Sequence, residues 1–462
     1  MSMPQQIKPD TKGRAAPVQV LKTKAETALA ETFAAVERQL PGGDWLRQLR
    51  RAAAGAFTAE GLPHRRVEEW KFTDLRALMR DAYPISATAE PPKPAAIGAL
   101  VREALPGADL SKAFAAFIDG RAAGEAGLGG ISELDGASLA KFIDHPPTWL
   151  EAEIGEVSGH VSDGVLALNT ALFSDGAVLD IAEGREVETP IALIFGDAGG
   201  EARSVATRSV VRVGKGAKIV LVECHLGPTA PRQVNTLTQV VIGDGAEVVH
   251  IKLIGSRADS IHLGRTVATL GANAAYRPFQ MVTGDGIVRN DLAVTFRGQH
   301  ASFDLGSAKL VNGHGHADTT LVVDHAVPHC TSRELVKSVL ADKARAVFQG
   351  KVIVWPDAQK TDGKQMAQAL MLSPDAEFDS KPELEIYADD VVCGHGSTSA
   401  EIDPELIFYL RSRGIPLAEA QAMLVESFIG EAIDKAEPEA VREALRALAR
   451  GWLAEDARST KG

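Results

Sequence analysis

The sequence predicts a mainly β protein whose core is a parallel β-helix, with helical segments before and after it. The pattern Gly-x-x-Ala recurs at steps of 29, 28 and 27 residues, at 214–217, 243–246, 271–274 and 298–301. A second glycine series keeps a similar period, at Gly227, Gly255, Gly284 and Gly313. β-rich runs such as KIVLVECHL and EVVHIKLI fill the intervals. Units that bury an apolar face only against the next unit form a solenoid, and this period fits a parallel β-helix. A sandwich with coincidental spacing is the alternative.

The N-terminal part is expected to be helical and mixed. Apolar residues at helical spacing over 18–57, broken at Pro41-Gly42-Gly43, predict a helical hairpin. In the motif RVEEWKFT at 66–73 we expect Trp70 and Phe72 to be buried anchors, although its paired carboxylates beside a lysine would also suit acid–base work. The Pro-rich stretch at 87–97 predicts an extended linker, and 113–120 predicts a strand.

The C-terminal part returns to helical spacing. Asp403-Pro404 combines an N-cap residue with a proline at the first helical position, and Pro416 and Pro438 mark two further helix starts. We therefore expect an N-terminal domain at 1–155, the β-helix at 156–402 and a helical domain at 403–462.

Composition narrows the function classes. The 462 residues are 45% hydrophobic with a net charge of -12, and no basic stripe is present, which argues against nucleic acid or an anionic membrane as the main partner. Three widely separated cysteines favour a reducing cytoplasm, and no apolar run reaches the length of a membrane span. The sequence contains no GxxxxGK[ST], GxSxG or HExxH motif, so we expect neither ATP hydrolysis nor another enzymatic activity.

Histidines and cysteines gather in two parts of the predicted core, at Cys224-His225 and along a run containing His314, His316, His325, His329 and Cys330. A closed zinc site needs four ligands at short regular spacings, and no CxxC is present. On a strand, His314 and His316 would share a face. The favoured interpretation is that these histidines line a polar face or fill repeat turns, and that Cys224 is a small buried apolar residue.

The most distinctive chemistry lies at Cys393 and His395. Val391 to Cys393 resembles the end of a strand, and Gly394 and Gly396 then predict a tight turn that leaves His395 close to Cys393. An iron–sulfur cluster needs three or four soft ligands, of which these residues supply at most two. A cluster here would need ligands from another chain. The alternative is a turn thiol and a capping imidazole.

Several motifs at both ends of the chain carry a family resemblance: RVEEWKFTDL at 66–75, AVFQGKVIV at 346–354, AQKTDGKQMAQALMLS at 358–373, KPELEIYADDVVCGHGST at 381–398 and FYLRSRGI at 408–415. They resemble the SufD family of the SUF iron–sulfur cluster assembly machinery over nearly the full length of the chain. Leu410 stands where the related SufB chains carry a cysteine, and the SufB-type HEATT segment is absent, so both differences favour SufD over SufB.

The resemblance implies a right-handed β-helix in a non-catalytic, cytoplasmic scaffold subunit. Such a subunit pairs with SufB through the C-terminal end of the β-helix, where Cys393 and His395 would handle iron or sulfur for a transient shared cluster. The C-terminal helices would dock the SufC ATPase, with Leu424, Phe428 and Ile433 as candidate contacts. Reduced flavin is associated with complexes of this family, although no residue here identifies a flavin pocket.

Two functions other than a scaffold subunit paired with SufB also fit the sequence. Many β-helices act on carbohydrate, which requires carboxylates clustered on successive coils. The candidates Asp285, Asp291 and Asp304 are not in repeat phase. The other alternative is a homodimeric scaffold that acts alone through the same strands.

Overall fold

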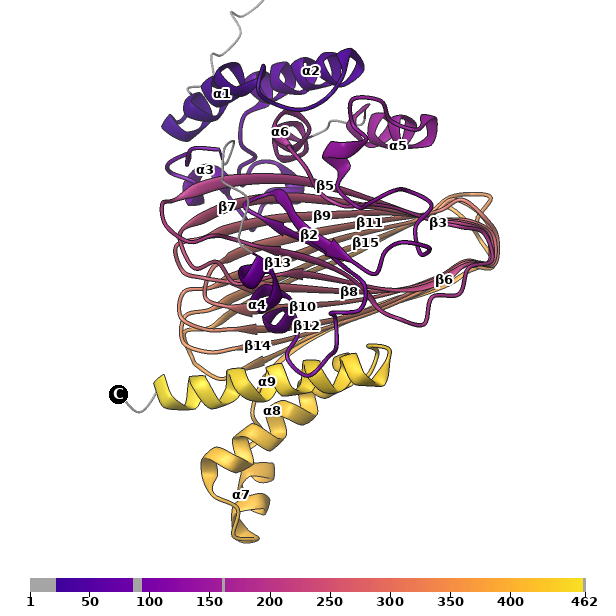
Figure 1. Ribbon diagram of the computed structural model, residues 1–462. Coiled ribbons are helices and arrows are strands. Elements are labelled where there is room, and N and C mark those ends of the chain that lie inside the picture. The colour runs from indigo at the N-terminus through magenta and orange to yellow at the C-terminus, as the bar shows by residue number, and fades with distance from the viewer. Residues whose placement is uncertain (1–21, 86–93, 160–162, 460–462) are drawn as a thin grey trace, which may run out of the picture.

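The computed structural model describes residues 22–85, 94–159 and 163–459. Its core is a two-sheet parallel solenoid in which successive strands alternate between the sheets (Figure 1). One sheet has eight strands: β3 (Val178–Ile181), β5 (Arg203–Val213), β7 (Arg232–Ile242), β9 (Ile261–Leu270), β11 (Ile287–Phe296), β13 (His316–His325), β15 (Arg345–Val354) and β17 (Glu377–Ile386). The predicted parallel β-helix architecture is confirmed.

The second sheet has ten strands: β1 (Phe114–Ile118), β2 (Arg121–Ala126), β4 (Ile191–Gly196), β6 (Lys218–His225), β8 (Glu247–Ser256), β10 (Ala275–Gly284), β12 (Ser302–Val311), β14 (Thr331–Leu340), β16 (Asp362–Met371) and β18 (Val392–Glu401). The predicted strand at 113–120 is β1, which pairs in parallel with β4. Strand β2 pairs antiparallel with β1 and forms one edge of this sheet. The solenoid sheet thus includes strands that precede residue 155.

The Gly-x-x-Ala pattern marks the turns that lead from the eight-stranded sheet to the ten-stranded sheet. The third turn residue has a left-handed backbone in consecutive coils, with φ of 63° at Gly216, 66° at Gly245 and 57° at Asn273. In these turns the backbone N–H of this residue donates to a carbonyl of the following coil, as from Gly216 to Asp244 at 2.8 Å. Glycine fits because it has no Cβ to oppose a positive φ. We call this row of turn residues the turn ridge.

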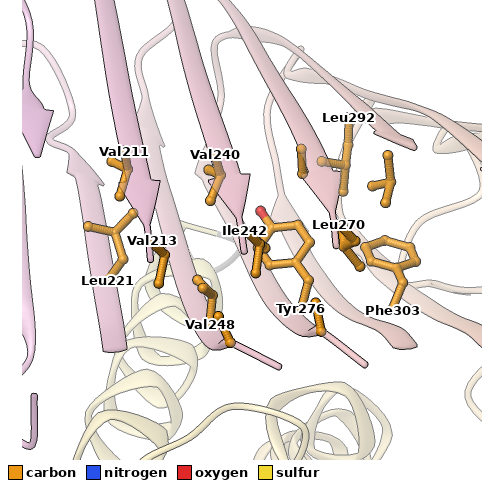
Figure 2. Close-up of a cluster of buried hydrophobic side chains, with 14 of the residues drawn as sticks. Val211, Val213, Leu221, Val240, Ile242, Val248, Leu270, Tyr276, Leu292 and Phe303 are labelled. Carbon is orange, nitrogen blue, oxygen red and sulfur yellow. The ribbon is translucent and has the colours of Figure 1, made fainter. Parts of the chain in front are cut away.

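The hydrophobic core lies between the two sheets. Figure 2 shows side chains from both sheets meeting there, among them Val211, Val240 and Leu292 from the eight-stranded sheet and Leu221 and Phe303 from the ten-stranded one. Strand side chains alternate between two faces, so one face of each strand lines this core. Each coil contributes to one continuous apolar interior that no single repeat could form.

Helices cover the outer faces of both sheets (Figure 1). The predicted helical hairpin is α1 (Lys24–Val36) and α2 (Asp44–Glu60), and α2 packs on α6 (Gly164–Leu172), which contacts β5 and β7. The remaining N-terminal helices are the 3-10 turn Glu68–Trp70, α3 (Leu75–Leu78), α4 (Pro94–Ala104), a second 3-10 turn at Leu139–Lys141 and α5 (Thr148–Gly159). Because α4 begins at Pro94, the predicted extended linker is wrong for residues 94–97, and residues 87–93 lie outside the described part of the chain.

The RVEEWKFT motif connects the N-terminal region to the later coils of the solenoid, from β11 to β17. Trp70 is buried beneath the guanidinium of Arg289, which lies 3.8 Å from the ring centroid. Glu68 forms an ion pair with Lys381 of β17. The predicted burial of Trp70 is confirmed, whereas Phe72 is only half-buried. The carboxylate and tryptophan of this motif therefore have a structural explanation.

The three predicted C-terminal helices are α7 (Pro404–Ser412), α8 (Leu417–Ile433) and α9 (Glu439–Ser459). Helix α8 contacts β12 and β14, and two ion pairs, Lys337 with Glu431 and Lys435 with Asp304, fasten it to the ten-stranded sheet. Helix α7 projects away from the solenoid (Figure 1) and contacts α8.

Candidate functional site: the open end of the solenoid

The last coil leaves both sheets with a terminal strand. Among the strands of residues 22–85, 94–159 and 163–459, β18 pairs with β16 alone and β17 with β15 alone. The N–H of Val392 donates to the carbonyl of Thr361 at 2.9 Å, so Val392 faces β16. Hydrogen-bonding direction alternates along a parallel strand. The backbone N–H and C=O groups of Cys393, His395, Ser397 and Ser399 therefore point away from β16, and we call this row the free edge.

The opposite terminal strand is less open. The N–H of Glu377 donates to the carbonyl of Ala344 in the preceding coil, so the backbone groups of Glu377 face β15. Because the direction alternates along the strand, the backbone groups of Pro382, five residues later, point outward. Proline has no N–H, and its presence on an edge strand removes a donor that another strand could use. The uninterrupted row of outward donors is therefore on β18.

Cys393 and His395 lie on this free edge, but the predicted tight turn between them is wrong. Residues Val392–Glu401 form one extended strand, in which Gly394 and Gly396 pair with Lys364 and Met366 of β16. Cys393 and His395 share a face because they are two residues apart, which places their Cα atoms roughly 7 Å from each other. Strand geometry, not a turn, brings the thiol and the imidazole together.

The Cys393 thiol sits at the boundary between core and solvent. Its side chain is half-buried and packs against the solenoid core, and it lies opposite Gly363 of β16. Burial raises the pKa of this thiol, and the carboxyl groups of Asp362 and Glu334 raise it further, while the Gly363 N–H opposes them. A metal that binds here would displace the thiol proton, since the thiolate is the ligand form.

A column of polar side chains continues inward from His395. His395 is exposed and lies opposite Gln365, which in turn lies opposite Glu334, and both of these are buried. Burial raises the pKa of Glu334 to about 8. Sequence analysis missed Glu334 and Gln365 as neighbours of the site. Their spacing of 31 and 30 residues from one to the next, close to the repeat period, is the signal that would have identified them.

An exposed apolar corner adjoins the free edge. Trp355 and Tyr387 stack with ring centroids 5.9 Å apart, at the ends of two neighbouring strands of the eight-stranded sheet. Ile386 and Val392 are also exposed, and Val392 directly precedes Cys393. Aromatic and aliphatic side chains exposed together commonly mark a protein interface.

The other histidines considered as metal ligands lie in different environments. His314 is exposed in a turn, so the predicted face shared with His316 on a strand is wrong. His316 is buried, and its Nε2 lies 2.9 Å from the hydroxyl of Thr73, which also donates to Asp318. His325 packs against Phe296 with its ring tilted by 31°, and burial lowers the pKa of His325 to about 4.

The cysteines of these groups are internal. Cys224 is fully buried, as predicted, and burial raises its pKa, while the adjacent His225 forms a 2.6 Å hydrogen bond with Glu223. Cys330 is also buried. Across residues 22–85, 94–159 and 163–459, no three His, Cys, Asp or Glu side chains are arranged to hold a metal ion.

The C-terminal candidates differ in exposure. Ile433 is buried in this chain's own core, Leu424 is half-buried, and Phe428 is half-buried beneath the ammonium group of Lys337. Helix α7 has no buried residue and exposes Phe408 at 75% of its surface. Sequence analysis missed the exposed apolar residues of this helix, Leu406, Phe408 and Tyr409, which we call the α7 surface.

None of the helices in the described part of the chain has both the length and the apolar character needed to cross a bilayer.

Comparison with known proteins identifies the family. Residues 195–428 match the model of the SufBD core domain of the SUF iron–sulfur cluster assembly system, and residues 24–193 match the SufBD N-terminal region. The chain is 29% identical over 433 residues to an iron–sulfur cluster assembly SufBD family protein of Synechocystis, covering 90% of this chain and 91% of the relative. It is also 29% identical over 393 residues to the iron–sulfur cluster assembly protein SufD of Escherichia coli, covering 84% and 88%. The chain therefore belongs to the SufBD family of iron–sulfur cluster assembly proteins.

Proposed function

We propose that this chain is a non-catalytic, cytoplasmic scaffold subunit that builds a nascent iron–sulfur cluster together with a SufB partner. The observation that carries the proposal is the position of Cys393 and His395 on a terminal strand whose backbone donors and acceptors face outward. A strand edge of this kind is a template for pairing with another chain. The cluster ligands and the pairing surface are then the same strand.

The donor set supports a shared site. One thiolate and one imidazole are soft and borderline ligands that suit iron, but a cluster needs about three or four. A partner strand paired along the free edge would bring its own side chains next to Cys393 and His395. The cluster is therefore transient and belongs to both chains, and it is the cargo of the assembly process.

The C-terminal helices are the proposed dock for the SufC ATPase. Helix α7 is only nine residues long and buries none of them, yet Leu406, Phe408 and Tyr409 are exposed on it. A short helix gains little stability by itself, so an apolar helix held away from the core is best explained by a partner. Leu424 and Phe428 extend this surface along α8, whereas Ile433 supports α8 from inside.

The carbohydrate-active alternative lacks support in the geometry. Asp291 pairs with Arg265 and Arg289 on the eight-stranded sheet, and Asp304 pairs with Lys435 on the ten-stranded sheet. The carboxylates of a glycosidase must instead flank one bond within about 10 Å of each other.

The test is co-expression with SufB and SufC followed by anaerobic reconstitution, read by visible absorbance and iron content. We expect Cys393→Ala and His395→Ala to form the complex but to lose cluster. Ser399→Ala is the matched control, because it alters the same face of β18 without removing an iron ligand. Unchanged cluster content in both site variants would place the ligands wholly within SufB. A chain that assembles cluster as a homodimer would support the scaffold acting alone.

A further inference from the structure

We propose that His300 and His329, on the turn ridge, form a surface binding site for a divalent transition metal ion. The metal class follows from the residues alone. That the ion in the cell is ferrous iron, captured for cluster assembly, rests on the function proposed above.

The two imidazoles lie side by side in consecutive coils. Their ring centroids are 4.8 Å apart and their planes differ by 16°. Both side chains are exposed, and within the described residues no side-chain hydrogen bond holds either ring. Small rotations about the side-chain torsions can therefore direct one nitrogen of each ring to a common point. Imidazole nitrogen suits divalent iron, nickel, copper and zinc, in contrast to the oxygen ligands that calcium and magnesium require.

The backbone conformation of the turn does not require histidine at this position. Equivalent ridge positions in earlier coils are Gly216 and Gly245, which fit a left-handed backbone without strain, and then Asn273. His300 and His329 adopt the same conformation with φ of 61° and 63°. Two adjacent imidazoles at positions where glycine is favoured indicate a role for the side chains, as strained residues often do at functional sites.

Cys330 does not join this pair. It follows His329 directly, but its side chain is buried and its thiol donates to the carbonyl of Gly298 at 3.4 Å. The site thus offers two protein ligands, and water completes the coordination. An open coordination sphere of this kind binds a metal exchangeably, which suits an ion that must be passed on.

The turn ridge leads toward the cluster site. The N–H of His329 donates to the carbonyl of Gln359, and the N–H of Lys360 donates to the carbonyl of Asp390, so the ridge continues through two more coils to the residues that precede Cys393. Neighbouring strands lie roughly 4.8 Å apart, which puts His329 and Cys393 roughly 10 Å apart along the solenoid axis. A metal held at the histidine pair is already close to the free edge.

The experiment measures metal binding without any cluster chemistry. The full chain carrying Cys393→Ala and His395→Ala is titrated anaerobically with Co²⁺ and with Fe²⁺ by calorimetry. The same background with His300→Asn and His329→Asn removes the proposed ligands while keeping a residue that tolerates the left-handed backbone, as Asn273 does one coil earlier. His314→Asn, at an exposed histidine in another turn, is the matched control.

We expect the parent protein and its His314→Asn variant to bind one equivalent of Co²⁺ or of Fe²⁺. The variant with both His300→Asn and His329→Asn, called the asparagine pair, should not bind this equivalent. Equal stoichiometry and affinity in the asparagine pair would overturn the proposal. Thermal melting of all variants establishes that they are folded. In the complex with native Cys393 and His395, the asparagine pair should slow cluster formation at limiting iron and not at excess iron. Metal binding would persist even if Cys393 and His395 proved dispensable for the cluster, so failure of the two proposals is distinguishable.

Discussion

Substituting Ser397 by proline should break association with the SufB partner without unfolding this chain. Ser397 lies on the free edge of β18, and its N–H points away from β16 because Val392, five residues earlier, donates to Thr361. Proline removes that outward N–H and places its ring where a partner strand would lie. Edge strands tolerate proline, and the preceding Gly396 is already extended.

The expected loss follows from one backbone hydrogen bond. Its net contribution is about 0.5–1.5 kcal/mol, and the partner carbonyl left without a donor costs about 1–3 kcal/mol more. At about 1.4 kcal/mol per factor of ten, the dissociation constant should rise roughly tenfold to a thousandfold.

Calorimetric titration of SufB into the purified variants measures this change. Ser397→Ala keeps the N–H and should bind like the parent, whereas Thr398→Pro removes a donor to β16 and should lower the melting temperature of the chain itself. If Ser397→Pro binds SufB as tightly as Ser397→Ala does, the two solenoids do not pair through the backbone of β18.

Four further substitutions test the α7 surface and three buried positions. Phe408→Asp should abolish co-purification with SufC at an unchanged melting temperature, whereas Ile433→Asp should lower the melting temperature because it buries a charge. Glu334 has a pKa of about 8 in the folded chain against an ordinary 4.5, so between these pH values the folded chain retains a proton that the unfolded chain releases. The free energy of unfolding should therefore fall as pH rises from about 4.5 to about 8. In the Glu334→Gln variant, the thermal melting midpoint should change less with pH over this range. Trp70→Ala should cost about 3–5 kcal/mol in urea unfolding followed by circular dichroism, and a loss below 1 kcal/mol would contradict its role as an anchor.

The repeat pattern located the coils through the first residue of each turn, because a Cβ at Gly214, Gly243, Gly271 or Gly298 would come within 2.8 Å of backbone atoms of the preceding coil. The third turn residue has a positive φ, which Gly216 and Gly245 adopt without strain. Later coils keep a positive φ at this third residue with His300, His329 and Lys360, so glycine disappears from that position, while turn hydrogen bonds continue from the N–H groups of His329 and Lys360. The period of the fold was therefore predictable from the sequence in the first coils and hidden by side-chain substitution in the last ones.

The candidate site shows the opposite error. Gly394 and Gly396 favour a turn when considered locally, but pairing with β16 holds them in an extended strand, so tertiary structure overrides the local preference. Glycine fits at residue 396 for a different reason. A Cβ at this position would lie only 2.7 Å from the terminal methyl group of Met366. Cys393 and His395 lie on one face of β18 because they are two residues apart on a strand, and the turn predicted from the sequence does not form.

The two ends of the solenoid differ in a way that explains why the site lies where it does. At the N-terminal end, β2 turns back antiparallel on β1, and α4 packs against β1, β2 and β4. At the C-terminal end, the chain leaves β18 for helices that return to β12 and β14 instead of covering the last coil. Solenoids require caps because an uncovered terminal coil exposes both apolar core and backbone hydrogen-bonding groups. If the proposed function holds, the cap of this coil is the partner protein, which would cover the half-buried Cys393, the exposed Trp355 and Tyr387 and the free edge. On that proposal, the cluster site would be completed only on association, and cluster assembly would depend on formation of the complex.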